Sequence, residues 1–132
     1  MSWSISFTVP GQAVQFARTG SRGAQRYTPP KQRVHMAAVK MFAATAMGDD
    51  SPREGPLKLD LLVEYLIPKS WSAKKRDAAF WKTSAPDSDN LAKLVKDSLN
   101  KIVYHNDAQI VWLEVRKVYG DRVQSRITIT EL

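Results

Sequence analysis

Apolar and polar residues alternate along two stretches of the chain. The sequence WSISFTV (residues 3–9) alternates large apolar residues with serine and threonine, and LKLDLLVEYLI (57–67) places an apolar residue at every second position. A period of two is typical of a strand that buries one of its faces. Pro10-Gly11 and Pro68 directly follow these stretches and end them. Two β-strands are therefore predicted.

Three other segments show features of helices. Apolar residues recur at helical spacing between positions 31 and 47 and predict an amphipathic helix with the face Val34, Ala38, Met41, Phe42 and Thr45. A short helix is predicted over 70–82, opened by Ser70 or Ser72. From position 89, DNLAKLVKDSLNKIV predicts a helix with the apolar stripe Leu91, Leu94, Val95, Leu99 and Ile102.

The last third of the chain completes the predicted fold. Residues 108–119 and 122–130 are rich in β-branched and aromatic residues and predict two strands, joined as a hairpin around Gly120. The resulting order is β-α-β-α-α-β-β. It predicts a single α+β domain over residues 1–132, with a mixed or antiparallel sheet and helices.

Length and composition agree with a folded protein. The chain has 132 residues, of which 43% are hydrophobic and 25% are charged, and this is enough for a buried core. The absence of cysteine excludes disulfides and thiolate metal sites. The N-terminal sequence lacks the pattern of a signal peptide, and no apolar run approaches the roughly 20 residues that span a bilayer. A cytoplasmic protein is expected.

Charge is unevenly distributed along the chain. The formal net charge is +7, and residues 1–48 contain no acidic residue. Within them, residues 17–30 combine arginines with glycines and prolines, which predicts an exposed loop or irregular hairpin. A segment with one sign of charge is typical of proteins that bind a polyanion such as nucleic acid, although a basic surface kept for solubility would explain it equally well.

Two carboxylates stand at the start of the predicted helix in PDSDNLAK. With Asp89 as the N-cap, Lys93 and Asp97 follow four and eight positions later, and Asp87 lies just before the cap. Capping explains Asp89 by itself, but one cap does not need two carboxylates. Close carboxylates repel unless a cation or proton lies between them. Mg²⁺ is suitable because it binds one or two carboxylates together with water and phosphate oxygens.

Other candidate groups are few. Asp107, in HNDAQI, lies in a predicted turn from which it can reach the same helix start, although it also suits a turn on its own. His35 and His105 are the only histidines, which excludes a multi-histidine metal site. The common phosphate-loop, dinucleotide-binding and nucleophile-elbow patterns are absent. Trp71 and Trp81, on either side of a lysine–arginine cluster, are either core residues or contacts to bases.

The segment PDSDNLAKLVKDSLNKIVYHNDAQI (86–110) resembles the signature of the RusA family of Holliday junction resolvases, endonucleases common in phages and prophages. The family pattern is D-x-D-N-x-x-K, followed by an Asp within the helix and an Asp-Gln-type turn. The matching positions are Asp87, Asp89, Asn90, Lys93, Asp97 and Asp107. The sequence VPGQ, an arginine-bearing loop and the sequence YTP are similar too, so the resemblance covers nearly the whole chain.

This resemblance implies a homodimer that binds four-way DNA junctions and nicks them with Mg²⁺, or with Mn²⁺ as an alternative ion. It implies that Asp87, Asp89 and Asp107 are catalytic carboxylates that hold the metal, and that Lys93 is their basic partner. Asn90 and Asp97 would be secondary. The chemistry agrees, because a metal activates water and polarises a phosphate, while a lysine offsets charge that develops in the transition state.

Two positions depart from the family pattern. Many members carry two acids in the turn where this chain has Asn106 and Asp107, and the loop that contains Arg18 is less rich in arginine and proline. Phosphate contacts position DNA without reading its sequence. The candidates for such contacts are Arg18, Arg22, Arg26, Lys31, Lys74, Lys75 and Arg76.

Two rival interpretations remain open at this point. The chain would be a non-catalytic basic DNA-binding module of a phage or prophage if its acids only cap a helix. Alternatively, it would be an enzyme of another class that acts on a nucleotide or another phosphorylated small molecule. Metal-dependent nicking of a junction separates the leading hypothesis from the first rival, and preference for junctions over duplex separates it from the second.

Overall fold

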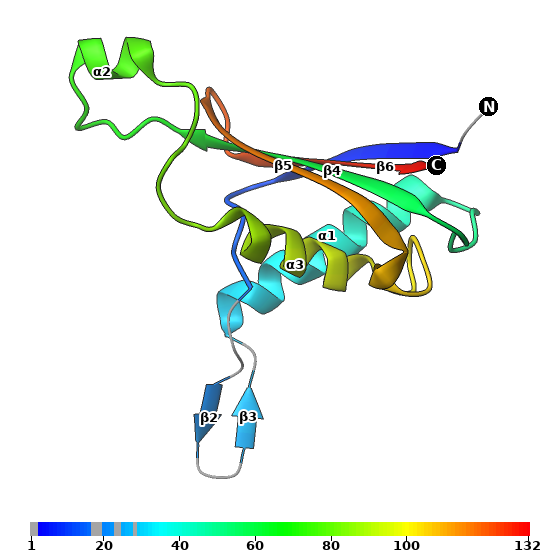
Figure 1. The fold of residues 1–132 in the computed structure, drawn as a ribbon. Helices are drawn as coiled ribbons and strands as arrows, with labels where there is room; N and C mark the ends of the chain where they lie inside the picture. The colour runs from blue at the N-terminus through cyan, green and yellow to red at the C-terminus, as the bar shows by residue number, and fades with distance from the viewer. Residues whose placement is uncertain (1–2, 17–19, 23–24, 28) are drawn as a thin grey trace.

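The computed structural model describes residues 3–16, 20–22, 25–27 and 29–132 (Figure 1). The strands are β1 (Ser4–Pro10), β2 (Gly20–Arg22), β3 (Gln25–Tyr27), β4 (Leu57–Leu66), β5 (Ile110–Gly120) and β6 (Gln124–Glu131). The helices are α1 (Pro30–Met47), α2 (Ala73–Ala78), α3 (Ser88–Leu99) and the 3₁₀-helix η1 (Asp107–Gln109). The predicted α+β class and order are confirmed, and the hairpin β2–β3 lies where a loop or irregular hairpin was predicted.

Four strands form a mixed sheet in the order β1-β6-β4-β5. Strand β6 is antiparallel to both β1 and β4, whereas β5 is parallel to β4. The predicted hairpin of the last two strands is wrong, because β4 lies between β5 and β6 in the sheet. The parallel pair is explained by helix α3, which follows β4 and returns the chain to the edge where β5 starts.

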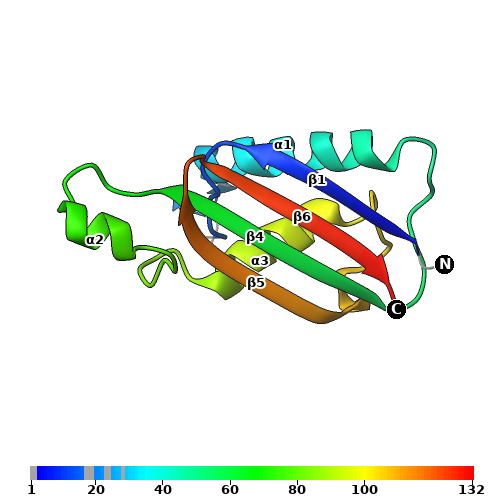
Figure 2. The same cartoon turned by 90° about the horizontal axis from the view of Figure 1, so that it is seen from above.

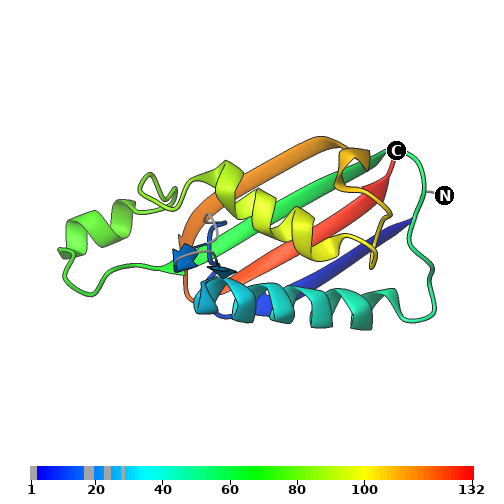
Figure 3. The same ribbon diagram turned by 90° about the horizontal axis from the view of Figure 1, so that it is seen from below.

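The two long helices cover one face of the sheet. Figures 1 and 3 show α1 and α3 side by side beneath the strands, and Figure 2 shows the opposite face, which no helix of the described chain covers. The central strand β4 alternates accordingly, with every second residue buried from Leu57 to Tyr65. The core therefore lies between this face of the sheet and the two helices.

Helix α1 buries a different face from the predicted one. Val34 and Met41, which belong to the predicted apolar face, are 71% and 59% exposed. The buried residues are Gln32, His35, Val39, Ala43 and Met47. Alanine and methionine occur all around this helix, so its apolar pattern does not single out one face. Packing against β1 selects a face that includes a polar glutamine and a histidine.

The other two helices differ in how far they are embedded. Helix α3 buries most of its predicted stripe, with Leu91, Leu94, Val95 and Leu99 in the core. Helix α2 is shorter than predicted and begins after Ser72, whose hydroxyl accepts a hydrogen bond from the backbone N–H of Lys75. None of the described helices is both long and apolar enough to cross a membrane.

Candidate active site

The start of α3, the turn η1 and the first part of β5 enclose a hollow of about 260 Å³. Its lining residues are Asp89, Ala92, Lys93, Lys96, Asp107 and Leu113. Three of the four predicted catalytic residues therefore share one depression, although 18 positions separate the first from the last in the sequence. The fourth, Asp87, is not among the lining residues.

Asp87 and Asp89 both lie at the positive end of α3. Asp87, rather than the predicted Asp89, is the N-cap, and its carbonyl accepts a hydrogen bond from the N–H of Leu91 at 3.1 Å. Asp89 lies in the first turn, where its Oδ1 accepts a hydrogen bond from the Asn90 N–H at 3.0 Å. The helix can start two residues earlier than predicted because Ser88 and Asp89 both tolerate the first turn, where N–H groups lack helical partners. The helix dipole favours both negative charges there.

Lys93 is placed by contacts on two sides. Its Nζ lies 3.5 Å from Asp97 Oδ2, one helical turn later, and 4.7 Å from the centre of the Phe16 ring. The Phe16 N–H donates a hydrogen bond of 3.0 Å to the Asn90 carbonyl. The chain that leads into the basic segment therefore docks directly on the first turn of α3. The predicted DNA contact Arg18 follows two positions later and lies outside the described residues.

Asp107 is held in a tightly bonded turn. The Asn106 side chain accepts a hydrogen bond from the Ala108 N–H at 2.8 Å. Gln109 Oε1 accepts hydrogen bonds from the backbone N–H groups of His105 and Asn106, at 2.9 and 3.1 Å. Its Nε2 donates to the carbonyls of Arg53 and Gly55, both at 3.0 Å, which anchors the turn to the chain before β4.

Sequence reasoning missed the role of Gln109. The signal was present, because Asn106 followed by Gln109 has the spacing of a capping box, in which an Asn, Ser or Thr cap is paired with a Gln or Glu three residues later. That pairing fixes the backbone of the turn, and Asp107 lies between its two members.

Tyr104 is fully buried. Its hydroxyl donates a hydrogen bond of 2.6 Å to the carbonyl of Lys96. Burial raises the pKa of Tyr104, and the negative charges of Asp107 and Asp97 raise it further. The hydroxyl therefore stays protonated and remains a donor to the last turn of α3.

Lys117 holds the segment that precedes the site. Its Nζ donates to the carbonyls of Ser84 and Pro86, both at 2.8 Å, directly before Asp87. Lys117 pairs in register with Val63, a core residue of β4, so it lies on the helix-covered face of the sheet. A lysine on that face is unusual, and this unusual place in the alternating pattern of β5 was the sequence signal for its role.

The carboxylates of this hollow suit a cation that takes most of its ligands from water and phosphate oxygens. Asp89 and Lys96 are about 10 Å apart along the helix axis, at 1.5 Å per residue. Asp107, from η1, lines the same hollow as both of them. In the part of the chain that the structure describes, no three acidic or histidine side chains gather as a complete cage. Mg²⁺ does not require one, because one or two carboxylates are sufficient.

The predicted DNA-contact residues lie in separate parts of the fold. Lys31 is exposed in the first turn of α1, and Lys74, Lys75 and Arg76 are exposed on α2. Arg22 and Arg26 lie in β2 and β3, of which the structure describes the backbone. Figure 1 shows that the hairpin and α2 project from the sheet in different directions.

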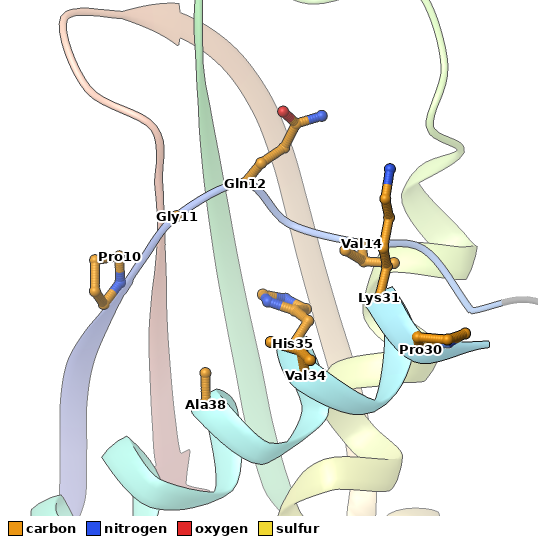
Figure 4. A pocket seen from close by; sticks show the side chains of 9 residues that line it. All are labelled: Pro10, Gly11, Gln12, Val14, Pro30, Lys31, Val34, His35 and Ala38. Carbon is orange, nitrogen blue, oxygen red and sulfur yellow. The ribbon is translucent and has the colours of Figure 1, made fainter. Parts of the chain in front are cut away.

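A larger hollow of about 590 Å³ lies between the end of β1 and the start of α1 (Figure 4). Figure 4 shows the ring of His35 among apolar neighbours, while Gln12 and Lys31 extend away from it. Burial lowers the pKa of His35, so the imidazole is neutral near pH 7. The residues that line this hollow, all of them described, include no carboxylate, so it is distinct from the acidic site.

Comparison with known proteins identifies the family. The family model described as Endodeoxyribonuclease RusA matches residues 9–130. A Bacillus subtilis (strain 168) protein, named Uncharacterized protein YqaN, is 32% identical over 143 residues, which cover 97% of this chain and 96% of that protein. A Lactococcus phage r1t protein, named Crossover junction endodeoxyribonuclease rusA, is 45% identical over 78 residues, which cover 58% of this chain and 56% of that protein. Because the family model spans nearly the whole chain, this protein belongs to the RusA family of endodeoxyribonucleases, as the resemblance of its acidic motif predicted.

Proposed function

We propose that this protein is a Mg²⁺-dependent endonuclease that nicks four-way DNA junctions during recombination and repair. The observation that carries the proposal is the common hollow of Asp89, Lys93 and Asp107 at the start of α3. The name of the phage relative supports a crossover junction as the substrate. A DNA substrate in a bacterial host, of chromosomal or phage origin, would place the activity in the cytoplasm.

Each residue of the site has a role in this proposal. Asp89 and Asp107 would hold Mg²⁺, with Asp87 joining them from the N-cap of α3. When bound, the ion would polarise the scissile phosphate and lower the pKa of the attacking water, and Mn²⁺ could replace it. Lys93 would offset the charge that builds up on the phosphate in the transition state. Lys96, in the same hollow, adds a second positive charge for DNA.

Basic residues outside the acidic hollow would contact DNA, and a second copy of the chain would provide a second active site. The docking of Phe16 on Asn90 brings the acid-free N-terminal segment to the mouth of the site. Its arginines and Lys31, together with the basic residues of α2, would bind phosphates along the arms of a junction. We further propose a homodimer, because paired cuts across a four-way junction need two active sites related by symmetry.

A cleavage assay tests the proposal. The wild-type protein is incubated with a four-way junction, a flap and a linear duplex of shared sequence, with and without Mg²⁺. We expect nicking of the junction only when Mg²⁺ is present, and we expect Asp89→Asn to bind the junction while cutting at least ~100-fold more slowly. Asp121→Asn is the matched control, because it removes an exposed carboxylate from the turn between β5 and β6 and should cut normally.

The assay also separates the rival functions. Salt-sensitive binding without metal-dependent nicking by the wild type would favour a non-catalytic DNA-binding module. Equal affinity for junction and duplex would weaken the junction assignment. Robust cleavage by Asp89→Asn would overturn the assignment of the site.

A further inference from the structure

A second hollow, about 520 Å³ in volume, lies beside α2 and is named here the α2 pocket. The residues of the α2 pocket that matter here are Trp71, Lys75, Phe80, Trp81, Ser84 and Tyr119. Phe80 and Trp81 are 56% and 59% exposed, so these two large rings face water and contribute little to the core. Exposed aromatic clusters in a hollow are typical of binding sites.

The rings of the α2 pocket are arranged in edge-to-face pairs. Phe80 and Trp81 have centroids 4.7 Å apart at an interplanar angle of 89°. Trp71 and Tyr119 have centroids 5.2 Å apart at 66°. In an edge-to-face pair, at least one ring keeps a flat face free of its partner, and such a face is what a nucleobase stacks against.

Positive charge surrounds these rings. Lys75 Nζ lies 4.0 Å from the centre of a Trp71 ring, and Lys82 Nζ lies 5.5 Å from that of Tyr119. Between Lys69 and Pro86 the chain has five basic residues and one acidic residue. A purely apolar protein partner would leave these cations without counterions, whereas a nucleotide offers a flat base to the rings and a phosphate to the lysines.

Hydrogen bonds connect the α2 pocket to the segment that leads into the acidic site. The Tyr119 N–H donates to the Phe80 carbonyl at 2.7 Å, and the Lys82 N–H donates to the Lys117 carbonyl at 2.9 Å. Lys117 in turn bonds the carbonyls of Ser84 and Pro86, which directly precede Asp87. A ligand in the α2 pocket would therefore be held by the same segment that leads into the candidate active site.

We propose that the α2 pocket binds an unpaired nucleobase of branched DNA by stacking it against Trp81 and its neighbours, with Lys75 and Lys82 neutralising the adjoining phosphates. This inference rests on the proposed function. Extruding a base costs least where its stacking is already weakened, so placing one in the pocket would cost less at the crossover of an open junction than in a continuous duplex. The α2 pocket would thus select branched over linear DNA.

A binding experiment tests this assignment in the absence of Mg²⁺, so that no cleavage occurs. Affinities are measured for a four-way junction, a linear duplex of the same sequence and a short oligothymidylate. We expect Trp81→Ala to bind the junction and the oligothymidylate roughly tenfold more weakly, because a stacked base is lost, and to bind the duplex as the wild type does. Trp81→Leu should behave like Trp81→Ala, since leucine keeps apolar bulk but has no ring to stack.

The matched control is Trp112→Ala. Trp112 is also exposed, at 49%, and also has a lysine, Lys58, over its ring at 4.1 Å, but it lies on β5 outside the α2 pocket. Its loss should leave all three affinities unchanged. Sedimentation of the wild type and Trp81→Ala without DNA reports whether the pocket instead joins two protein chains.

Each outcome decides the assignment. Unchanged junction affinity in Trp81→Ala, equal losses on junction and duplex, wild-type behaviour of Trp81→Leu, or a change in oligomeric state would each overturn the base pocket. Junction nicking by the wild type together with any of these results would refute the pocket and leave the proposed function standing. Trp81-dependent oligothymidylate binding without any nicking of the junction would support the base pocket and refute the proposed nuclease function.

Discussion

Helices α2 and α3 both present charged side chains to the surroundings, but they are supported differently. Helix α3 has 12 residues, of which six are buried against the sheet and α1. Helix α2 has six residues, all within the described chain, and none of them is buried. It is held by the Ser72 cap and by a hydrogen bond of 3.0 Å from Arg76 to the Pro68 carbonyl.

This difference matches what each region is proposed to do. Catalytic groups must keep a fixed geometry relative to the scissile phosphate, and a helix anchored in the core provides it. Phosphates and unstacked bases of branched DNA vary in position, and a segment with few buried contacts rearranges at lower free-energy cost than the core does. Chemistry is therefore assigned to α3 and substrate capture to α2.

The sharpest test of this division exchanges one lysine for glutamine in each helix. We expect Lys93→Gln to slow junction nicking at saturating protein by at least ~100-fold, because it removes a positive charge beside the developing phosphate charge. Lys75→Gln should cut at the wild-type rate once saturated, but should bind more weakly and lower the salt dependence of binding by about 0.7–0.9 log units per log unit of salt. Single-turnover rates and binding isotherms at several salt concentrations measure both. If Lys75→Gln nicks as slowly as Lys93→Gln at saturating protein, then α2 and α3 do not differ in their roles.

The second test compares how much α3 and α2 each contribute to the stability of the fold. Leu94 is fully buried in α3, and Leu94→Ala should lower the free energy of unfolding by about 3 kcal/mol, from lost burial and the cavity left behind. Ala78→Gly in α2 should lower it by about 0.5 kcal/mol or less, because the loss of helix propensity is confined to a segment without core contacts. Urea titration measures both values. A loss in Ala78→Gly near that of Leu94→Ala would show that α2 unfolds together with the core.

The sequence predicted the two supports unequally well. The leucine stripe of α3 was predictable because its apolar residues leave only one face to bury. Helix α2 was predicted over residues 70–82 but spans only Ala73–Ala78. Phe80 and Lys82 belong instead to a segment whose backbone hydrogen-bonds to β5, and a contact between distant segments has no local pattern.

The candidate site was predictable in its charged residues, and in its supports only for Gln109, whose capping-box spacing with Asn106 is local. The spacing of Asp89 and Lys93 is local, so the sequence alone places them together on α3. The alternation of β5 marks Lys117 as unusual, but its hydrogen bonds to the Ser84 and Pro86 carbonyls depend on tertiary packing. The burial of His35 follows from the packing of α1 against β1, which an alanine-rich pattern does not specify.

A smaller effect on the nicking rate than that of Lys93→Gln is expected from the side chains that fix a backbone in each region. Gln109→Ala removes four hydrogen bonds that hold the turn of Asp107, and should cost about 1–2 kcal/mol of stability and roughly tenfold in nicking rate, as for the supports of metal ligands. Ser72→Ala removes the single cap bond of α2. It should leave the saturated nicking rate unchanged, because α2 adjusts without moving the core.

Gln124→Ala controls for the loss of a partly buried glutamine, since Gln124 bonds Glu64 at 3.2 Å and does not line the acidic hollow. Thermal unfolding and single-turnover nicking with a titration of Mg²⁺ separate loss of fold from loss of metal affinity. If Gln109→Ala requires more Mg²⁺ for half-maximal rate while Ser72→Ala and Gln124→Ala do not, Gln109 acts by positioning Asp107. Equal Mg²⁺ requirements in all three variants would assign Gln109 a purely structural role, and the contrast between the two regions would then rest on Lys93 and the core of α3 alone.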